Sequence, residues 1–445
     1  MFVPAPEIFK AYDIRGIVDK TLTVDAVRAI GHALGSEAVA RKQQAIAVGR
    51  DGRLSGPALA GALADGIRAA GVDVIDVGCV PTPLTYFAAY ELGTNSCVSV
   101  TGSHNPPDYN GLKMVLGGQT LFGELIQALR QRIIDGNLVT AAEPGKLTQA
   151  DVVPAYVSKI LGDVKLSRPM KIVMDCGNGV AGAVAPELFK RLGCELVELF
   201  CEVDGHFPNH HPDPSKPENL ADVIRALRDT DAEIGLAFDG DGDRVIAVDH
   251  FGRVVDGDRL IALAALLLRE EGRLHHDTVV VTVMSNLGFH KAMAAAGIEV
   301  VTTGVGDRYV LEALDAGGFS VGGEQSGHII YRDIATTGDG LLAGLRLAQF
   351  VHHHHEALAD LAANVMTSYP QLLVNVKVAE RHPHVAEELA AEIAAAEARL
   401  EGDGRILVRA SGTEPLIRVM VEAATDDLAR TVADELAAVV LARFG

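Results

Sequence analysis

The chain has 445 residues, 48% of them hydrophobic, and a formal net charge of −20 at pH 7. Its length suffices for about three domains, and its negative charge argues against a nucleic-acid partner, which requires clustered lysine and arginine. No apolar run approaches the roughly 20 residues that cross a bilayer, and the N-terminus has neither the basic nor the apolar region of a signal peptide, so we expect a cytoplasmic protein without a membrane partner.

Three segments repeat one pattern along the chain: an apolar strand, a turn, an alanine-rich helix that ends at glycine, and a second apolar strand. The helices are expected at residues 58–70, 183–192 and 290–296. Strands of valine and isoleucine without polar alternation are buried on both faces, and a glycine just after a helix suits its C-terminal cap. The pattern predicts three similar α/β domains with mixed, largely parallel sheets.

The pattern changes after Tyr369, where we expect a strand, a long helix over residues 385–400, two more strands and a final helix. This order indicates a smaller α+β domain at the C-terminus. We expect four domains around a central cleft, at residues 1–148, 149–252, 253–366 and 367–445. In open α/β sheets ligands bind beyond the strand ends, so the polar loops after the apolar strands are candidates for chemistry.

The first such loop, T-G-S-H-N-P-P-D-Y-N-G-L-K, holds Ser103 in a turn rich in glycine, asparagine and proline. His104 is its neighbour and Lys113 follows ten residues later. A small hydroxyl in a rigid turn with basic neighbours can act as a nucleophile or phosphate carrier. The alternative is an ordinary turn, since these residues are what turns use.

The second loop, D-G-D-G-D-R, is the strongest local signal. Its three aspartates alternate with glycine, so the carboxylates can converge, and hard oxygen ligands suit Mg²⁺: Asp239, Asp241 and Asp243. A solvated acidic turn and a calcium loop are the alternatives. The EF-hand pattern fails, because His250 stands where its twelfth-position glutamate should be.

Two further loops offer groups that bind sugars and phosphates. E-Q-S-G-H supplies Glu324, Ser326 and His328, which suit sugar hydroxyls, and R-A-S-G-T-E-P-L-I-R supplies groups for a phosphate: Arg409, Ser411, Gly412, Thr413 and Arg418. No Walker A motif occurs, which disfavours a P-loop kinase.

Cysteine and histidine show no pattern typical of a disulfide framework or a zinc site. The five cysteines are widely separated, so we expect them to be reduced and mostly buried: Cys79, Cys97, Cys176, Cys194 and Cys201. The histidine run at residues 352–355 has helical, polar surroundings, which favour an exposed helix end over a metal site.

In this order the four loops resemble those of the α-D-phosphohexomutase superfamily over essentially the whole chain. The resemblance implies a phosphoserine at Ser103, one Mg²⁺ per chain bound by that serine and the three aspartates, a sugar loop and a phosphate loop. It also implies a catalytic group and a set of substrate-binding residues. The catalytic group is Ser103, His104, Lys113 and Arg15; the substrate-binding set adds Tyr12, Arg244, Asp307 and Arg308 to the sugar and phosphate loops.

Within the superfamily the chain looks like a mosaic. The part that ends at D-G-D-G-D-R is similar to bacterial phosphomannomutase/phosphoglucomutase, whereas the part from V-V-D-G-D-R-L to the C-terminus looks like phosphoglucosamine mutase. Because the sugar loop lies in the second part, we expect glucosamine phosphate as the substrate, with mannose or glucose phosphate as the alternative. Tyr12 belongs to the first part and favours mannose or glucose phosphate as the substrate.

The resemblance implies a reversible transfer of phosphate between C6 and C1 of a hexose phosphate, through phospho-Ser103 and a hexose 1,6-bisphosphate that also serves as activator. His104, Lys113, Asp307 and His328 are candidates for general acid and base. A phosphosugar-binding protein without catalysis and a metal-dependent phosphatase are the competing interpretations. The expected oligomeric state is monomer or homodimer.

Overall fold

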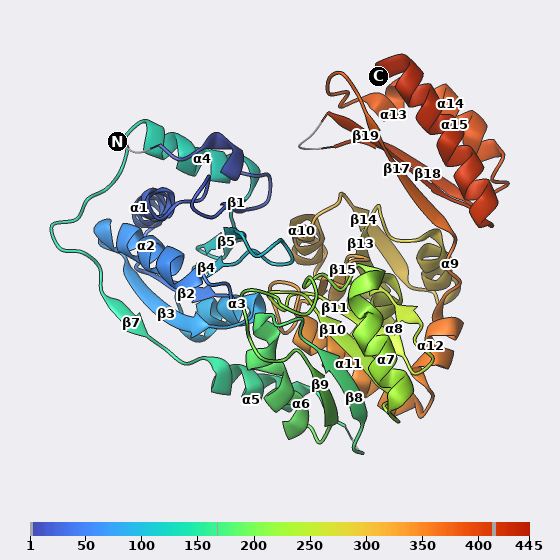
Figure 1. Ribbon diagram of the computed structural model, residues 1–445, viewed down its shortest axis with the longest axis horizontal. Helices are drawn as coiled ribbons and strands as arrows, with labels where there is room; N and C mark the ends of the chain where they lie inside the picture. Colours follow the sequence, from blue (N-terminus) through green and yellow to red (C-terminus); the bar gives the residue numbers. More distant parts are fainter. Residues whose placement is uncertain (1–2, 167, 412–414) are drawn as a thin grey trace. The chain divides into compact units, whose positions relative to one another are not determined.

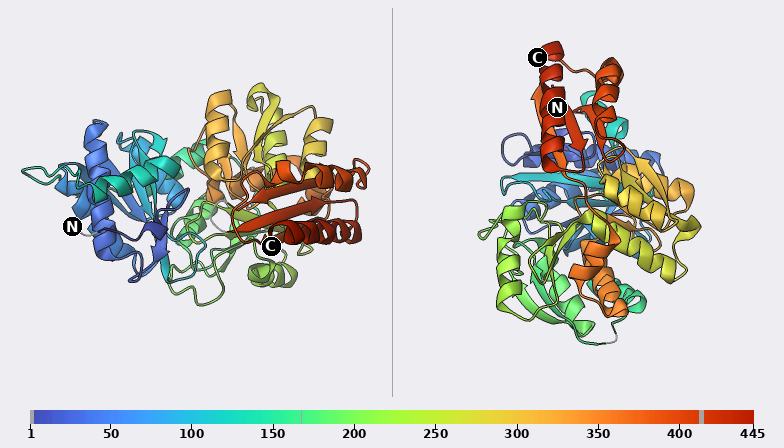
Figure 2. Two further views of the ribbon diagram at one scale, coloured as in Figure 1. Left: turned by 90° about the horizontal axis from the view of Figure 1, so that it is seen from above. Right: turned by 90° about the vertical axis from the view of Figure 1, so that its right-hand side faces the viewer.

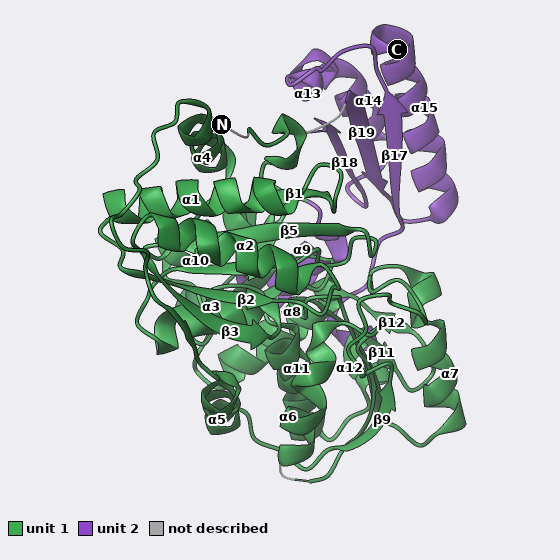
Figure 3. Ribbon diagram, turned by 60° about the vertical axis from the view of Figure 1, so that its left-hand side comes forward, with its two compact units in different colours: residues 1–283, 301–362 green, residues 284–300, 363–445 purple. Residues whose placement is uncertain are grey.

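The computed structural model describes residues 3–166, 168–411 and 415–445. These residues form two compact units, shown in Figure 3. Unit 1 comprises residues 1–283 and 301–362, and unit 2 comprises residues 284–300 and 363–445. In the described part of the chain, no helix is long and apolar enough to cross a membrane.

The first sheet of unit 1 has the strand order β1-β5-β4-β2-β3-β7, with β6 paired to β5 (Figure 1). Strand β2 runs parallel to β3 and β4, while β5 is antiparallel to β4 and β1. The strands are β1 (Ile14–Ile17), β2 (Ala45–Arg50), β3 (Asp73–Cys79), β4 (Cys97–Val100), β5 (Tyr109–Leu116), β6 (Gln119–Thr120) and β7 (Leu147–Gln149). The associated helices are η1 (Pro6–Ile8), α1 (Val24–Ala40), α2 (Gly56–Ala69), α3 (Thr82–Glu91) and α4 (Gly123–Ile134).

The second sheet has the order β12-β11-β10-β8-β9, with β10, β8 and β9 parallel and β11 antiparallel to β10. Its strands are β8 (Lys171–Asp175), β9 (Glu195–Leu199), β10 (Ile234–Phe238), β11 (Val245–Asp249) and β12 (Val254–Val255), and its helices are α5 (Val153–Asp163), η2 (Val180–Ala183), α6 (Ala185–Arg191), η3 (Pro217–Leu220) and α7 (Ala221–Asp229). The helix predicted at residues 183–192 is present as α6, which begins at Ala185 after the short helix η2. Pro186 lies in the first turn of α6, where its missing N–H leaves no hydrogen bond unmade.

The third sheet has the order β14-β13-β15-β16. Its strands are β13 (Thr278–Thr282), β14 (Glu299–Thr303), β15 (Val321–Gly323) and β16 (Ile329–Tyr331). The helices in this part of the chain are α8 (Gly257–Glu270), η4 (His275–Asp277), α9 (Leu287–Ala295), α10 (Asp307–Gly317), α11 (Gly340–His354) and α12 (Leu358–Val365), of which α9 belongs to unit 2. The histidine run does end helix α11, but His352 is buried, contrary to the prediction of an exposed end. It lies four residues after Ala348 and seven after Leu345, on the same buried face of the helix.

Unit 2 contains an antiparallel sheet of order β17-β19-β18, and α13, α14 and α15 cover one face of it (Figures 1 and 2). Its elements are β17 (Gln371–Lys377), α13 (Val385–Glu388), α14 (Ala390–Ala398), β18 (Arg405–Ala410), β19 (Leu416–Glu422) and α15 (Asp426–Phe444). The single helix predicted over residues 385–400 is wrong. It breaks at Leu389, whose φ and ψ of −109° and 16° leave the helical region while its side chain is fully buried in the core.

A buried ion pair joins β18, β19 and α9 within unit 2. Glu422 is fully buried and accepts hydrogen bonds from Arg405 Nε (3.1 Å) and Nη2 (3.1 Å), and from the N–H of Leu287 (2.9 Å). These contacts place residues 284–300 with the C-terminal sheet.

Replacing Glu422 with glutamine is therefore expected to destabilise unit 2 by about 3 kcal/mol, because it leaves a guanidinium without its counter-charge. Native-state hydrogen exchange of the β17–β19 amides measures the change. The matched control is Glu435→Gln, which removes an exposed partner of Arg399 on α15 and should cost less than about 1 kcal/mol. Equal effects of the two substitutions would contradict a structural role for the buried pair.

Candidate active site

Ser103 lies in the loop between β4 and β5 in a left-handed backbone conformation, with φ of 48°. Such a conformation is uncommon for a residue other than glycine and persists only where neighbouring contacts hold it. The side chain is buried, and Oγ lies 3.0 Å from His104 Nδ1 and donates to Asp239 Oδ2 at 3.0 Å. The structure therefore brings the serine of the first loop against the first aspartate of the second.

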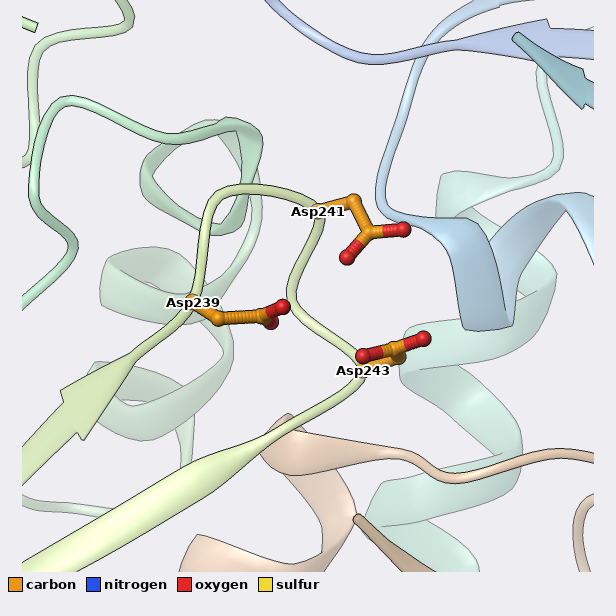
Figure 4. A group of neighbouring side chains, drawn as sticks. All are labelled: Asp239, Asp241 and Asp243. Atoms are coloured by element: carbon orange, nitrogen blue, oxygen red, sulfur yellow. The ribbon is translucent and has the colours of Figure 1, made fainter. Parts of the chain in front are cut away.

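The acidic loop connects β10 to β11 in the second sheet. Asp239, Asp241 and Asp243 are all buried, and Figure 4 shows their carboxylates turned toward one shared space. One oxygen of each lies within 4.8 Å of the others. Oδ1 of Asp241 and Oδ1 of Asp243 are buried without a hydrogen-bond donor among the described residues. Buried carboxylate oxygens without donors are the ligands a hard divalent cation takes, so this site fits a metal ion.

Two residues from the first domain bind the acidic loop. Lys113 Nζ donates to Asp241 Oδ2 (2.8 Å) and Asp243 Oδ2 (2.6 Å), and Thr82 Oγ1 donates to Asp241 Oδ2 at 2.7 Å. Burial alone would lower the pKa of Lys113, but the three aspartates outweigh it and raise that pKa well above its ordinary value. Lys113 therefore stays protonated. Thr82, at the start of α3, has no sequence signal that singles it out.

The aspartates respond differently to this environment. Burial, followed by the charge of Asp241, raises the pKa of Asp239 well above its ordinary value. Burial also acts to raise the pKa values of Asp241 and Asp243, but Lys113 reverses the effect and both pKa values fall. The site thus concentrates negative charge at Asp241 and Asp243, beside the ammonium of Lys113.

His104 is neutral in this setting. Burial and the nearby Arg244 guanidinium lower the pKa of His104 to about 3, so the ring is uncharged while its Nδ1 lies within hydrogen-bonding distance of the Ser103 hydroxyl. Arg15 forms an ion pair with Asp13, and its charge contributes to the low pKa of His104. Arg15 therefore influences the serine loop through its charge.

Two side chains of the loop between β15 and β16, Glu324 and His328, contact different neighbours. Glu324 Oε1 accepts the N–H of Gly306 at 3.1 Å, which holds the turn before α10, and burial raises the pKa of this carboxyl. His328 is buried, with Nε2 accepting the N–H of Gly338 (3.0 Å) and Nδ1 3.6 Å from Asp243 Oδ1. His328 therefore lies against Asp243 of the acidic loop.

An aromatic cage surrounds the guanidinium of Arg308. Its central carbon lies 3.7 Å from the ring centroid of Phe122, 4.0 Å from that of Tyr309 and 5.9 Å from that of Tyr12. The Tyr12 hydroxyl also donates to the carbonyl of Val305 at 3.2 Å. Stacking fixes the plane of a guanidinium and leaves its edge for hydrogen bonds. Phe122 was not among the predicted residues, because a single phenylalanine before a helix is an ordinary core pattern.

Two other predicted substrate residues lie beside His328 and Asp243. Arg244 has its Nε 3.9 Å from Asp243 Oδ1, and Asp307 Oδ2 lies 3.9 Å from His328 Nε2. Ser326 Oγ is buried without a hydrogen-bond partner among the described residues. Arginine, carboxylate and hydroxyl groups thus gather within unit 1 at the ends of the second and third sheets.

The last predicted loop belongs to unit 2. Arg409 and Arg418 stand directly opposite each other on β18 and β19, and the N–H of Ser411 donates to the carbonyl of Leu416 at 2.8 Å. Gly412 and Thr413 lie outside the described residues. Two facing arginines at the base of a hairpin provide a concentrated positive charge.

The sequence matches four domains that together cover most of the chain. They are described as Phosphoglucomutase/phosphomannomutase, alpha/beta/alpha domain I (residues 6–138), domain II (154–252), domain III (256–369) and C-terminal domain (373–439). This order confirms the prediction of three α/β domains followed by a separate C-terminal domain.

Whole-length relatives carry more than one name. A phosphoglucomutase of Neisseria gonorrhoeae is 43% identical over 98% of this chain and 96% of its own length, and a phosphoglucosamine mutase of Frankia alni is 42% identical over 98% of both. The crystal structure of a phosphoglucomutase/phosphomannomutase family protein from Burkholderia thailandensis matches with a TM-score of 0.88 and 42% identity, covering 99% of this chain and 98% of that one. The fold and overall chemistry are therefore common to these relatives, while their sugars differ.

Proposed function

This chain belongs to the phosphoglucomutase/phosphomannomutase family of the α-D-phosphohexomutase superfamily, and we propose that it moves phosphate between C6 and C1 of a hexose through phosphorylated Ser103. As a phosphohexomutase it is an isomerase, an intramolecular phosphotransferase. The observation that carries the proposal is the contact of Ser103 Oγ with both His104 Nδ1 and Asp239 Oδ2, each at 3.0 Å.

The proposed reaction has two balanced transfers. In the first, the bond between phosphorus and Ser103 Oγ breaks while a bond forms to the free C1 or C6 hydroxyl oxygen of a hexose monophosphate, giving a 1,6-bisphosphate, and the proton of that hydroxyl ends on Ser103 Oγ. The bisphosphate turns over, and in the second transfer the bond from phosphorus to the other sugar oxygen breaks while a bond forms to Ser103 Oγ, whose proton ends on the freed sugar oxygen. The same bisphosphate added from outside would phosphorylate a dephosphorylated serine and so activate the protein.

The residues around Ser103 have separate proposed roles. Neutral His104 takes the Ser103 hydroxyl proton when the serine accepts phosphate, and protonated Lys113 and Arg244 balance the negative charge of the transferring group. Asp239, Asp241 and Asp243, with an oxygen of Ser103 or its phosphate, would hold Mg²⁺, which supplies further charge neutralisation during transfer. Arg409, Ser411, Gly412, Thr413 and Arg418 are proposed to bind the phosphate that is not being transferred.

The decisive experiment incubates the protein with ³²P-labelled glucose 1,6-bisphosphate and locates the label by peptide mapping. Label on Ser103, together with interconversion of hexose 1- and 6-phosphates, supports the proposal. Binding of sugar phosphate without labelling of the protein would indicate a phosphosugar-binding protein without catalysis. Release of free phosphate at the turnover rate would indicate a metal-dependent phosphatase.

Glucosamine phosphate is the proposed substrate. Glu324 and Asp307 place two carboxyl groups near the Arg308 cage, and a carboxylate binds the ammonium of glucosamine more strongly than it binds the C2 hydroxyl of glucose or mannose. The sugar loop E-Q-S-G-H also resembles that of phosphoglucosamine mutases. The alternative substrates are mannose and glucose phosphates, as in relatives named for those sugars.

We therefore expect kcat/KM to be higher for glucosamine 6-phosphate than for glucose or mannose 6-phosphate. Glu324→Gln should reduce that preference about tenfold, the equivalent of one charge-assisted hydrogen bond. The control is Glu312→Gln, an exposed glutamate on α10, which should leave the ratio unchanged. A tenfold or greater preference of the unmodified protein for mannose or glucose phosphate would overturn the assignment.

A further inference from the structure

Arg53 lies in the turn between β2 and α2, and its side chain is completely buried. Its guanidinium donates to four backbone carbonyls of the serine loop. Nη2 donates to Ser103 (2.9 Å) and Asn105 (2.5 Å), and Nη1 donates to Pro106 (2.5 Å) and Tyr109 (2.8 Å). Nε donates to Asp51 Oδ2 at 3.2 Å. A guanidinium has five N–H donors, and all five are used, so none is left for a substrate.

Asp51 completes the support from the other side of the loop. Its Oδ2 accepts from Thr101 Oγ1 (2.7 Å) and from the N–H of Gly102 (3.0 Å), and Thr101 Oγ1 in turn accepts the N–H of Ser103 at 2.8 Å. The residues before and after Ser103 are therefore tied to one buried ion pair.

Close packing fixes the guanidinium itself. A Cβ at Gly102 would lie 2.3 Å from Arg53 Nε, so only glycine leaves room for it there. The ring of Phe207 faces the guanidinium from the second domain, with the Arg53 central carbon 5.1 Å from the ring centroid. A lysine has no planar fork and cannot reach four carbonyls at once.

We propose that Arg53 is a positioning residue that holds Ser103 Oγ in line with the sugar, so that phosphate passes to the sugar rather than to water. Ser103 has a left-handed backbone conformation, with φ of 48°, that persists only where its surroundings impose it. Without the carbonyl contacts the loop relaxes, and Oγ leaves its position beside His104 and Asp239. The inference rests on the proposed phospho-Ser103 function.

The test compares Arg53→Lys and Gly102→Ala with two matched controls, all first labelled with ³²P-glucose 1,6-bisphosphate. Arg346→Lys changes another fully buried arginine in the same unit, paired with Asp163 and Glu271. Gly61→Ala adds a methyl group where nothing lies within 4 Å. Gly102→Ala displaces the Arg53 guanidinium while retaining its charge. If Arg53→Lys fails to fold, Gly102→Ala therefore still tests whether Arg53 positions Ser103.

We expect kcat to fall about 100-fold in Arg53→Lys and Gly102→Ala, the effect of a reactive group misplaced by about 1 Å, with KM changed less than about twofold. The ratio of phosphoserine hydrolysis to phosphoryl transfer should rise at least tenfold in these variants and stay constant in the controls. The positioning role would be overturned if Gly102→Ala were labelled stoichiometrically and had an unchanged kcat and an unchanged ratio of phosphoserine hydrolysis to phosphoryl transfer. That result would leave the proposed function intact. An equal loss of kcat in Arg346→Lys would also overturn the positioning role. Absence of label on the unmodified protein would instead refute the proposed function.

Discussion

Replacement of Ser103 with alanine is expected to lower mutase turnover by on the order of 10⁴-fold or more, the scale of loss when a nucleophile is removed. The variant lacks the only oxygen that we propose to carry phosphate between the two ends of the sugar. The fold should persist, because alanine removes one hydroxyl and its contacts with His104 and Asp239. Turnover with a bisphosphate activator and incorporation of ³²P into the protein are the two measurements.

The control is Ser158→Ala, since the Ser158 hydroxyl is on α5 and donates to the carbonyl of Pro154 in its own helix. Ser158→Ala should keep both activity and labelling. If Ser103→Ala retained turnover within a few-fold of the unmodified protein, phosphate would not pass through this serine. Label retained on Ser103→Ala at another residue would lead to the same conclusion.

Replacement of Asp243 with asparagine is expected to weaken divalent-cation binding and to reduce turnover at least about 100-fold, more than the loss of an outer-shell partner usually costs. The change removes charge from a site where Asp243 Oδ1 is buried without a donor among the described residues. It also replaces one of the two carboxylates that Lys113 Nζ bridges with a neutral amide. Asp241→Asn should have a similar effect for the same reasons.

Metal binding is measured independently of activity by titrating the protein with Mn²⁺ and following free Mn²⁺ by electron paramagnetic resonance. Asp231→Asn serves as the control, because Asp231 precedes the same strand β10 but is exposed and bonded to Lys171. Unchanged Mn²⁺ affinity in both Asp243→Asn and Asp241→Asn would show that the metal binds elsewhere. If Asp243→Asn and Asp241→Asn lost no more Mn²⁺ affinity than Asp231→Asn, we would also conclude that the metal binds elsewhere.

Features that depend on the local order of residues along the chain were predictable from the sequence. Buried strands, alanine-rich helices and glycine stops repeat at a recognisable spacing, so the three α/β domains and the different C-terminal domain were predictable. The acidic loop was predictable as well, because Asp239, Asp241 and Asp243 are separated by single glycines, and any tight turn brings them together. Helix ends were less predictable, since the single helix expected over residues 385–400 is interrupted at Leu389, whose backbone leaves the helical region.

Contacts between groups far apart in the sequence could not be predicted, because they form when the sheets pack together. Lys113 binds Asp241 across 128 residues and Ser103 bonds Asp239 across 136, because the loops of one sheet pack against those of another. The same packing placed His328 behind Asp243 rather than in an open position, enclosed Arg308 with Phe122, and directed all five donors of Arg53 toward the serine loop and Asp51. A sequence specifies donors and acceptors, but their pairing depends on distances and directions that exist only after the chain has folded.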